Sequence, residues 1–111
     1  MSVCKAYEKE LLRLRHWLHQ HPELSMEEHL TTQFIYDYLN ALEIPCYKTG
    51  DTGVIATLML NPAYKTIAIR SEIDGLPIQE ATGLPFSSLY PGKMHACGHD
   101  AITAGNLCLA K

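Results

Sequence analysis

The stretch Met94-His95-Ala96-Cys97-Gly98-His99-Asp100 decides the fold, because it is a glycine-containing turn that runs directly into an apolar, helix-like segment. Cys97 and His99 lie two residues apart in it, beside the carboxylate of Asp100. Thiolate and imidazole are the usual protein ligands of zinc and of its neighbours in the first transition series. A buried cysteine and a hydrogen-bonded histidine in a structural turn would give the same pattern, since free cysteine is among the most buried residue types. The turn alone therefore leaves a metal site and a structural role open.

The composition is that of one small globular domain. Of 111 residues, 47% are hydrophobic and 19% are charged, and the net charge is −3. The nine Lys and Arg residues are scattered among twelve acidic ones, so no basic patch predicts a nucleic-acid partner. No apolar run approaches the ~20 residues that cross a membrane, and residues 1–10 carry charges unlike a signal peptide. We therefore expect a cytoplasmic protein with four reduced cysteines, and no membrane partner.

Two amphipathic helices are predicted in the N-terminal part. The first covers residues 3 to about 20, where apolar side chains recur at i, i+4, i+7 and i+11. It ends before Pro22, because the residue that precedes a proline is pushed out of the helical region. The second covers residues 26 to about 42, and Ser25 and Glu28 have the spacing of a capping box at its start.

After residue 45 the periodicity changes from helical to extended. Residues 46–49, 54–60 and 66–70 are predicted strands, and the last two are apolar on both faces, as in a sheet that is covered on both sides. Residues 73–96 contain four turn signals and form a long loop, which in a compact domain is usually functional or disordered. A helix from Asp100 onward completes an α/β layer fold, with two N-terminal helices, a sheet and a C-terminal helix.

A second group of acidic residues lies where the predicted strand 66–70 ends. Glu72 and Asp74 are two residues apart on an extended segment, so their carboxylates point to the same side. Two such carboxylates repel each other unless a cation lies between them or one is protonated, and the alternative is a solvated loop end. In open α/β sheets, sites gather at the carboxyl ends of strands, so the pair can meet Cys97 and His99 there. One carboxylate would bind a metal ion, and the other would orient a histidine ligand.

Other histidines and cysteines are interpreted structurally. His19 and Glu23 flank the end of the first helix, and capping with packing is the favoured interpretation, because the helix dipole stabilises a protonated histidine at a helix C-terminus. Cys4 and Cys108 lie on apolar helical faces and are expected in the core.

Three motifs follow one another along the chain. They are Leu18-His19-Gln20-His21-Pro22-Glu23-Leu24 with Glu27-Glu28, then Ile69-Arg70-Ser71-Glu72-Ile73-Asp74-Gly75-Leu76-Pro77-Ile78-Gln79-Glu80, and then Gly92-Lys93-Met94-His95-Ala96-Cys97-Gly98-His99-Asp100. Through these motifs and residues 82–88, the chain from residue 11 onward resembles the N-terminal portion of a metal-dependent amidohydrolase and peptidase family. That family holds hippurate hydrolases, N-acyl-amino-acid amidohydrolases, auxin-conjugate hydrolases and N-acetyl-diaminopimelate deacetylases.

The resemblance implies an incomplete zinc-peptidase-like catalytic domain that binds two divalent ions, which are zinc, manganese or cobalt. Cys97 and His99 fall on family metal ligands, and Asp74 falls on the catalytic carboxylate that supports the metal centre. Further support for the metal site is expected from Glu72, His95 and Asp100. A metal-bound water would attack the amide carbonyl of an N-acyl amino acid, with a glutamate as general base.

The sequence departs from the family pattern in two residues and in length. Members usually have Asp where this chain has Glu72, and His where it has Ile102. Their general base, remaining ligands and lid or dimerisation domain come after the part that matches residues 1–111. We therefore expect an N-terminal fragment of a catalytic domain, active only in a longer or complemented form, with a missing C-terminal portion or a homodimer as partner. The alternative is an inactive remnant that acts as a metal-binding or protein-interaction module.

Overall fold

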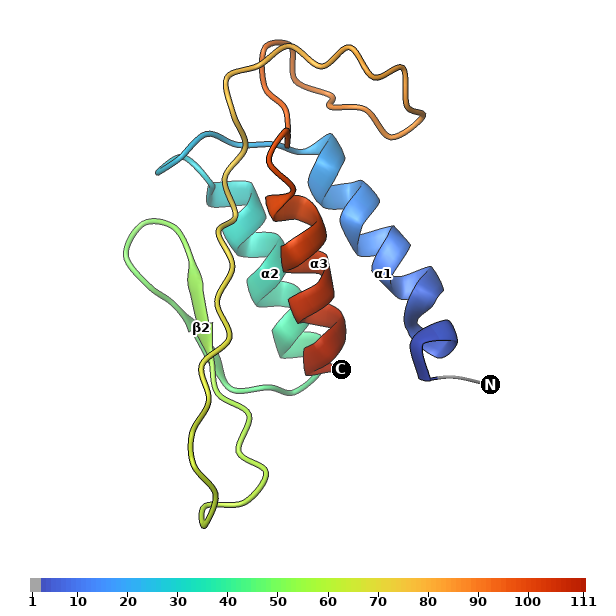
Figure 1. Ribbon diagram of the computed structural model, residues 1–111. Coiled ribbons are helices and arrows are strands. Elements are labelled where there is room, and N and C mark those ends of the chain that lie inside the picture. Colours follow the sequence, from blue (N-terminus) through green and yellow to red (C-terminus); the bar gives the residue numbers. More distant parts are fainter. Residues whose placement is uncertain (1–2) are drawn as a thin grey trace.

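Three helices lie side by side and a two-stranded ribbon lies next to α2 (Figure 1). The computed structural model describes residues 3–111, with side chains from Lys5 onward, so the side chain of Cys4 lies outside the described residues. The helices are α1 (Val3–Gln20), α2 (His29–Ala41) and α3 (His99–Ala110). Their facing apolar side chains form the buried core, which consists of Leu14, Leu18, Ile35, Leu39, Ile44, Ala104 and Leu107. Cys108 is half-buried and packs against this core, as its apolar neighbours predict.

The helix α1 has the predicted bounds and buried stripe, whereas α2 begins three residues later than predicted. Met26 has a φ of 70°, which a helix cannot contain, and it separates Ser25 from the helix start. The carboxylate of Glu23 takes the capping role instead, accepting hydrogen bonds from the backbone N–H groups of Leu30 (3.0 Å) and Thr31 (2.6 Å). The predicted capping box is therefore wrong, because a carboxylate from the preceding turn satisfies the free N–H groups of α2.

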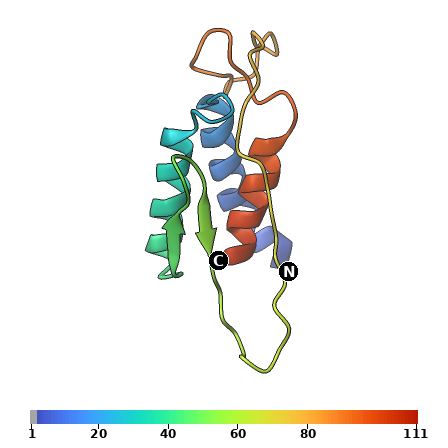
Figure 2. The same ribbon diagram turned by 90° about the vertical axis from the view of Figure 1, so that its left-hand side faces the viewer.

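The sheet is smaller than predicted. β1 (Cys46–Lys48) and β2 (Val54–Ala56) pair in antiparallel register, with Tyr47 opposite Ile55. The expected strand 54–60 stops at Ala56, and residues 66–70 pair with no strand among the described residues. A strand needs a neighbour to satisfy its backbone groups, and residues 66–70 have none within residues 3–111; the connection that leads to them from β2 projects from the body (Figures 1 and 2).

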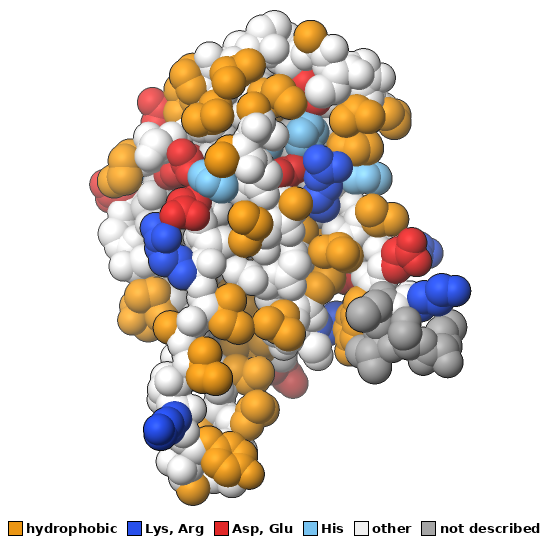
Figure 3. Space-filling model, in the orientation of Figure 1, with side chains coloured by type: hydrophobic (Ala, Val, Ile, Leu, Met, Phe, Trp, Pro, Cys, Tyr) orange, Lys and Arg blue, Asp and Glu red, His pale blue; other side chains and the backbone are white. Residues whose placement is uncertain are grey.

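The projecting segment carries many of the exposed apolar side chains. Leu60 and Ile67 are each 84% exposed, so the predicted burial on both faces does not occur within residues 3–111. Figure 3 shows hydrophobic side chains gathered on this part of the surface. Apolar, extended residues of this kind are suited to a larger sheet, which this stretch of chain does not build by itself.

The long loop predicted over residues 73–96 crosses the ends of α1 and α3 (Figure 1). It is well tied to the helices, with bonds that include a backbone hydrogen bond from Leu89 N to Gln20 O of 2.9 Å. Across the described part of the chain, no helix combines the length and the apolar character needed to span a membrane.

Candidate functional site

Three segments of the chain, around Glu23, Gly75 and Met94, contact one another beside the candidate site. Gly75 N donates to Glu23 O (2.7 Å), and Leu76 and Met94 exchange backbone hydrogen bonds of 2.8 and 3.0 Å. A Cβ atom on Gly75 would lie 2.8 Å from Pro22 Cβ and 3.2 Å from Met94 O. Only glycine fits this close approach, which brings the residue before it, an aspartate, next to the turn that follows Met94.

A left-handed glycine shapes the Cys-Gly-His turn. Gly98 has a φ of 95° and caps α3, and its carbonyl accepts hydrogen bonds from Ala101 N and Ile102 N, each at 3.1 Å. Nothing lies within 4 Å of a Cβ built on Gly98, so the requirement for glycine there is conformational rather than steric. The turn leaves Cys97 exposed and starts the helix at His99.

His99 is held by Asp74. Its Nδ1 lies 3.0 Å from Asp74 Oδ1 and 3.1 Å from the Asp74 carbonyl oxygen, and both side chains are about four-fifths buried. Both neighbours are acceptors, so Nδ1 carries the proton and Nε2 is the nitrogen that can bind a metal. Histidines that bind metals almost always donate their other N–H to a carboxylate or a backbone carbonyl, and His99 donates to both.

Glu72 does not join this pair. Its carboxylate lies 2.6 Å from Arg70 Nη1 in an exposed ion pair. A hydrogen bond to its own backbone and the Arg70 guanidinium hold the pKa of Glu72 below its ordinary value. The two carboxylates therefore have different partners: Asp74 contacts a histidine, as was expected of one member of the pair, whereas Glu72 lies at an exposed loop end, which was the alternative. Ile102, the other departure, is 51% exposed on α3.

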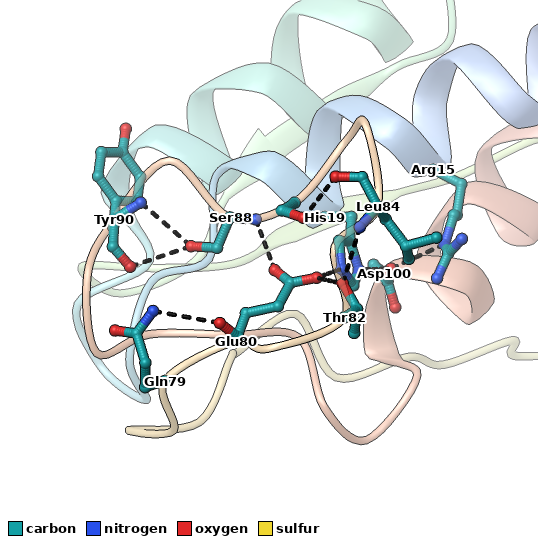
Figure 4. A network of polar contacts seen from close by, with 10 residues as sticks. Arg15, His19, Gln79, Glu80, Thr82, Leu84, Ser88, Tyr90 and Asp100 are labelled. Atoms are coloured by element: carbon teal, nitrogen blue, oxygen red, sulfur yellow. Dashed lines mark hydrogen bonds and ion pairs between the residues drawn. The ribbon is translucent and has the colours of Figure 1, made fainter.

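A buried charge network lies behind the turn (Figure 4). His19 of α1 is 2% exposed, and its Nδ1 lies 2.7 Å from Asp100 Oδ2 while its Nε2 lies 2.9 Å from Glu80 Oε1. Arg15, one turn earlier on α1, donates from Nε to the same Asp100 oxygen at 2.9 Å. Asp100 is in the first turn of α3, where the helix dipole also favours a negative charge. Nitrogen donors and carboxylates alternate in this network, so each of the two carboxylates has a partner on α1.

Glu80 ties the long loop into this network. Its Oε2 accepts from Ser88 N (2.5 Å) and its Oε1 from Thr82 Oγ1 (2.7 Å). Burial alone would raise the pKa of Glu80, but the hydrogen bonds from Ser88, His19 and Thr82 outweigh it and lower the pKa. In the same loop, the ring of Phe86 stacks on His16 with centroids 3.9 Å apart.

His95 is buried beside the turn without a partner. It is 4% exposed, and neither ring nitrogen has a hydrogen-bond partner within residues 3–111; the same holds for Asp100 Oδ1. Burial lowers the pKa of His95, which favours the neutral imidazole, the form that binds metals. An unpaired polar atom in the interior costs roughly 1–3 kcal/mol, so these atoms fit a site that offers them a partner.

The donor atoms near the turn fit part of a divalent-metal site. An exposed thiol on Cys97, the Nε2 atom of His99 and the unpaired nitrogens of His95 are of the right chemical type. No group of three or more His, Cys, Asp or Glu side chains in the described part of the chain is arranged to hold an ion. Hydrolytic zinc usually has three protein ligands, so residues 3–111 supply fewer than a complete site needs.

The contacts of His19 with Glu80 and Asp100 were not predicted from the sequence. His19 was interpreted as a capping and packing residue; it does lie buried in the last turn of α1, but the interpretation missed that both its nitrogens bond to carboxylates from distant segments. Its partners Glu80 and Asp100 lie in the second and third motifs, whereas His19 lies in the first. Each motif contributes one residue to this contact, but the sequence carries no signal that identifies these three residues among the other polar residues of the motifs.

The motifs also match known proteins. The model of Peptidase family M20/M25/M40 matches residues 68–111. N-acetyl-L-cysteine deacetylase of Bacillus subtilis (strain 168) is 48% identical over 101 residues, which are 90% of this chain and 24% of the relative. N-acetyldiaminopimelate deacetylase of Streptococcus suis (strain 05ZYH33) is 46% identical over 95 residues, 82% of this chain and 25% of the relative.

A solved structure shares the fold. The B. subtilis YXEP protein, described as a dinuclear metal-binding peptidase from the M20 family, superposes with a TM-score of 0.87 at 46% identity, over 93% of this chain and 30% of its own. The chain is related to peptidase family M20. These similarities confirm the resemblance to this family that the three motifs predict, and the α/β class expected from the order of the elements. The chain spans about a quarter of the length of the curated relatives it matches.

Proposed function

We propose that residues 1–111 form the N-terminal part of a catalytic domain of a metal-dependent amidohydrolase, which cleaves the amide bond of N-acyl amino acids. The observation that carries this proposal is the contact between Asp74 and His99, beside the exposed thiol of Cys97. Two ligands of suitable chemistry and a carboxylate that orients one of them lie together at one turn.

Each of these residues has a distinct role in the proposal. Cys97 and His99 bind a divalent ion (zinc, manganese or cobalt) through Sγ and Nε2, as half of a two-metal site. Asp74 fixes the tautomer and the orientation of the His99 ring, and His95 and Asp100 support the turn from the buried side. When bound, the metal lowers the pKa of a water molecule and polarises the amide carbonyl.

The substrate class is supported by the relatives, whose names are those of deacetylases of N-acetylcysteine and N-acetyldiaminopimelate. The general base and the remaining ligands would come from sequence that corresponds to the other three quarters of such relatives, on a longer chain or on a separate partner. Homodimerisation and the cytoplasmic location stay predictions.

A chimera tests the proposed function directly. This chain would replace the matching N-terminal quarter of the B. subtilis N-acetyl-L-cysteine deacetylase, to which it is 48% identical. We expect the manganese- or zinc-loaded chimera to release acetate from N-acetylcysteine or a related N-acyl amino acid. Cys97→Ala should abolish this activity, and Cys108→Ala, in the half-buried side of α3, should retain it. A folded, metal-loaded chimera without activity on a broad N-acyl panel would refute the proposal.

The inactive-remnant alternative is favoured by one observation. Glu72 pairs with Arg70 at the surface, whereas an aspartate is usual at this family position. If only a Glu72→Asp chimera hydrolysed amides, residues 1–111 would be a remnant that retained the fold and lost the chemistry.

A further inference from the structure

We infer that His19 is a positioning residue, which couples the loop of residues 76–94 to the turn that carries Cys97 and His99. The inference rests on the proposed function for what the turn does, and on the geometry of one buried ring for the coupling. His19 contacts one carboxylate in the loop, that of Glu80, and one that follows the turn, that of Asp100 (Figure 4). The positions of the loop and of the turn therefore depend on the same side chain.

The ring of His19 is fixed in place. It lies on α1, is 2% exposed and contacts the edge of Phe86 with centroids 5.5 Å apart. An imidazole donates from both nitrogens only when it is protonated, and here both nitrogens face carboxylate oxygens at 2.7 and 2.9 Å. Removal of the ring would take one hydrogen-bond partner from each carboxylate, leaving Asp100 with Arg15 and Glu80 with Ser88 and Thr82, and would remove the bond that joins the two sides.

On one side, His19 controls the start of α3. Asp100 is 1% exposed and directly follows His99 in the chain, so a displacement of Asp100 rotates the helix start that orients the His99 ring. Arg15 also contacts Asp100 Oδ2, but its side chain is 32% exposed, and within residues 3–111 it makes no hydrogen bond or ion pair with the loop carboxylate Glu80. The guanidinium of Arg15 also lies over the ring of Phe86 in the loop, 5.0 Å from its centroid, but His19 is the one of the two side chains that hydrogen-bonds to a carboxylate on each side.

On the other side, His19 closes the loop. Glu80 accepts hydrogen bonds from Ser88 N and Thr82 Oγ1, which fold residues 80–88 back on themselves. Leu89 N donates to Gln20 O, the residue after His19, at 2.9 Å. If Glu80 lost its bond to His19, residues 80–88 would be held less firmly against the end of α1, next to the candidate site.

Hydrogen exchange on the chain without metal tests the coupling. In His19→Ala, the amide of Ser88 in the loop and the amides of Ala101 and Ile102 after the turn should all exchange faster, by on the order of tenfold. Free imidazole, which can occupy the space left by the ring, should slow both sets together. Rescue by imidazole is not expected for a side chain that only fills space.

His16→Ala is the matched control. His16 is on the same helix and contacts the same loop by stacking on Phe86, but its recorded contact is aromatic and not with a carboxylate. It should leave the exchange of Ala101 and Ile102 unchanged. If His19→Ala fails to fold, Glu80→Gln replaces it in the test. This substitution weakens the bond between Glu80 and His19 Nε2, and it should still speed the exchange of the Ala101 and Ile102 amides.

Cobalt titration supplies the second measurement, through the absorption of a cobalt–thiolate bond. His19→Ala should weaken cobalt binding about tenfold, in the range seen when a residue behind a metal ligand is lost, and His16→Ala should not. Faster exchange in the loop alone, with unchanged turn amides and cobalt affinity, would overturn the coupling while the proposed function survives. Absence of a cobalt–thiolate band in the chimera with the deacetylase, which supplies the remaining ligands, would instead overturn the proposed function, and exchange at Ala101 and Ile102 would still decide the coupling.

Discussion

Gly75→Ala tests whether the close approach of three segments builds the site. The added Cβ would lie 2.8 Å from Pro22 Cβ and 3.2 Å from Met94 O. Carbon atoms in favourable contact are about 3.5–4.0 Å apart, so the methyl group overlaps a proline ring and a backbone oxygen, neither of which can rotate away. The segment that contains Gly75, the α1–α2 connection or the segment before the turn must then move.

The size of the effect follows from that overlap. Extra carbon atoms in a packed position cost about 1–3 kcal/mol, against a gain of about 0.4–1 kcal/mol from the lower entropy of the unfolded chain. We expect Gly75→Ala to lower the free energy of unfolding by about 1–1.5 kcal/mol, which corresponds to a fall in Tm of roughly 5–10 °C for a domain of this size. Thermal and urea unfolding, followed by circular dichroism, measure both quantities.

Gly105→Ala is the control for this substitution. Gly105 lies inside α3 and nothing is within 4 Å of its added Cβ, so alanine should stabilise the chain by about 0.5–1 kcal/mol through helix propensity. Equal stability of Gly75→Ala and the unaltered chain would refute the claim that the three segments are locked together at Gly75. Destabilisation by both alanines would show that the effect is not specific to that contact.

Two further substitutions probe the capping of α2 and the buried network. Glu23→Ala should lower the free energy of unfolding by about 1–2 kcal/mol, because two N–H groups of α2 lose their acceptor. Ser25 is exposed, so Ser25→Ala should change this free energy by less than about 0.5 kcal/mol. If urea unfolding gave the opposite order, Ser25 and not Glu23 would be the cap of α2. The pKa of Glu80 is lower in the folded chain than its ordinary value of 4.5, so its stabilising contribution is fully present above about pH 4.5 and is lost as the pH falls through the folded-state pKa. Urea midpoints measured between pH 6 and 3 should therefore fall less steeply for Glu80→Gln than for the unaltered chain, and parallel curves would contradict the assignment.

Local sequence signals predicted the helices and the turn well. Apolar periodicity gave α1 its observed span, because its stripe packs into a core that residues 3–111 complete. The turn before α3 was also predicted from the sequence, because Gly98 is the residue that permits a positive φ there. Both features depend on contacts within the described chain.

Features that depend on distant contacts were not predictable in the same way. The cap of α2 comes from Glu23, whose position is set by the contact of its carbonyl with Gly75, 52 residues further along the chain. Residues 66–70 have strand composition but pair with nothing in the described chain, and composition cannot show whether a neighbour is present. His19 looked like a capping residue because nothing local reveals that Glu80 and Asp100 reach it.

The central claim is that the Cys97–His99 turn binds a divalent metal ion. Its most direct test is a cobalt titration of the chain, read through the thiolate–cobalt absorption and repeated with Cys97→Ala and Cys108→Ala. We expect a band for the unaltered chain and for Cys108→Ala, whose thiol packs against the core, and no band for Cys97→Ala. An equal cobalt affinity in all three proteins would contradict the claim.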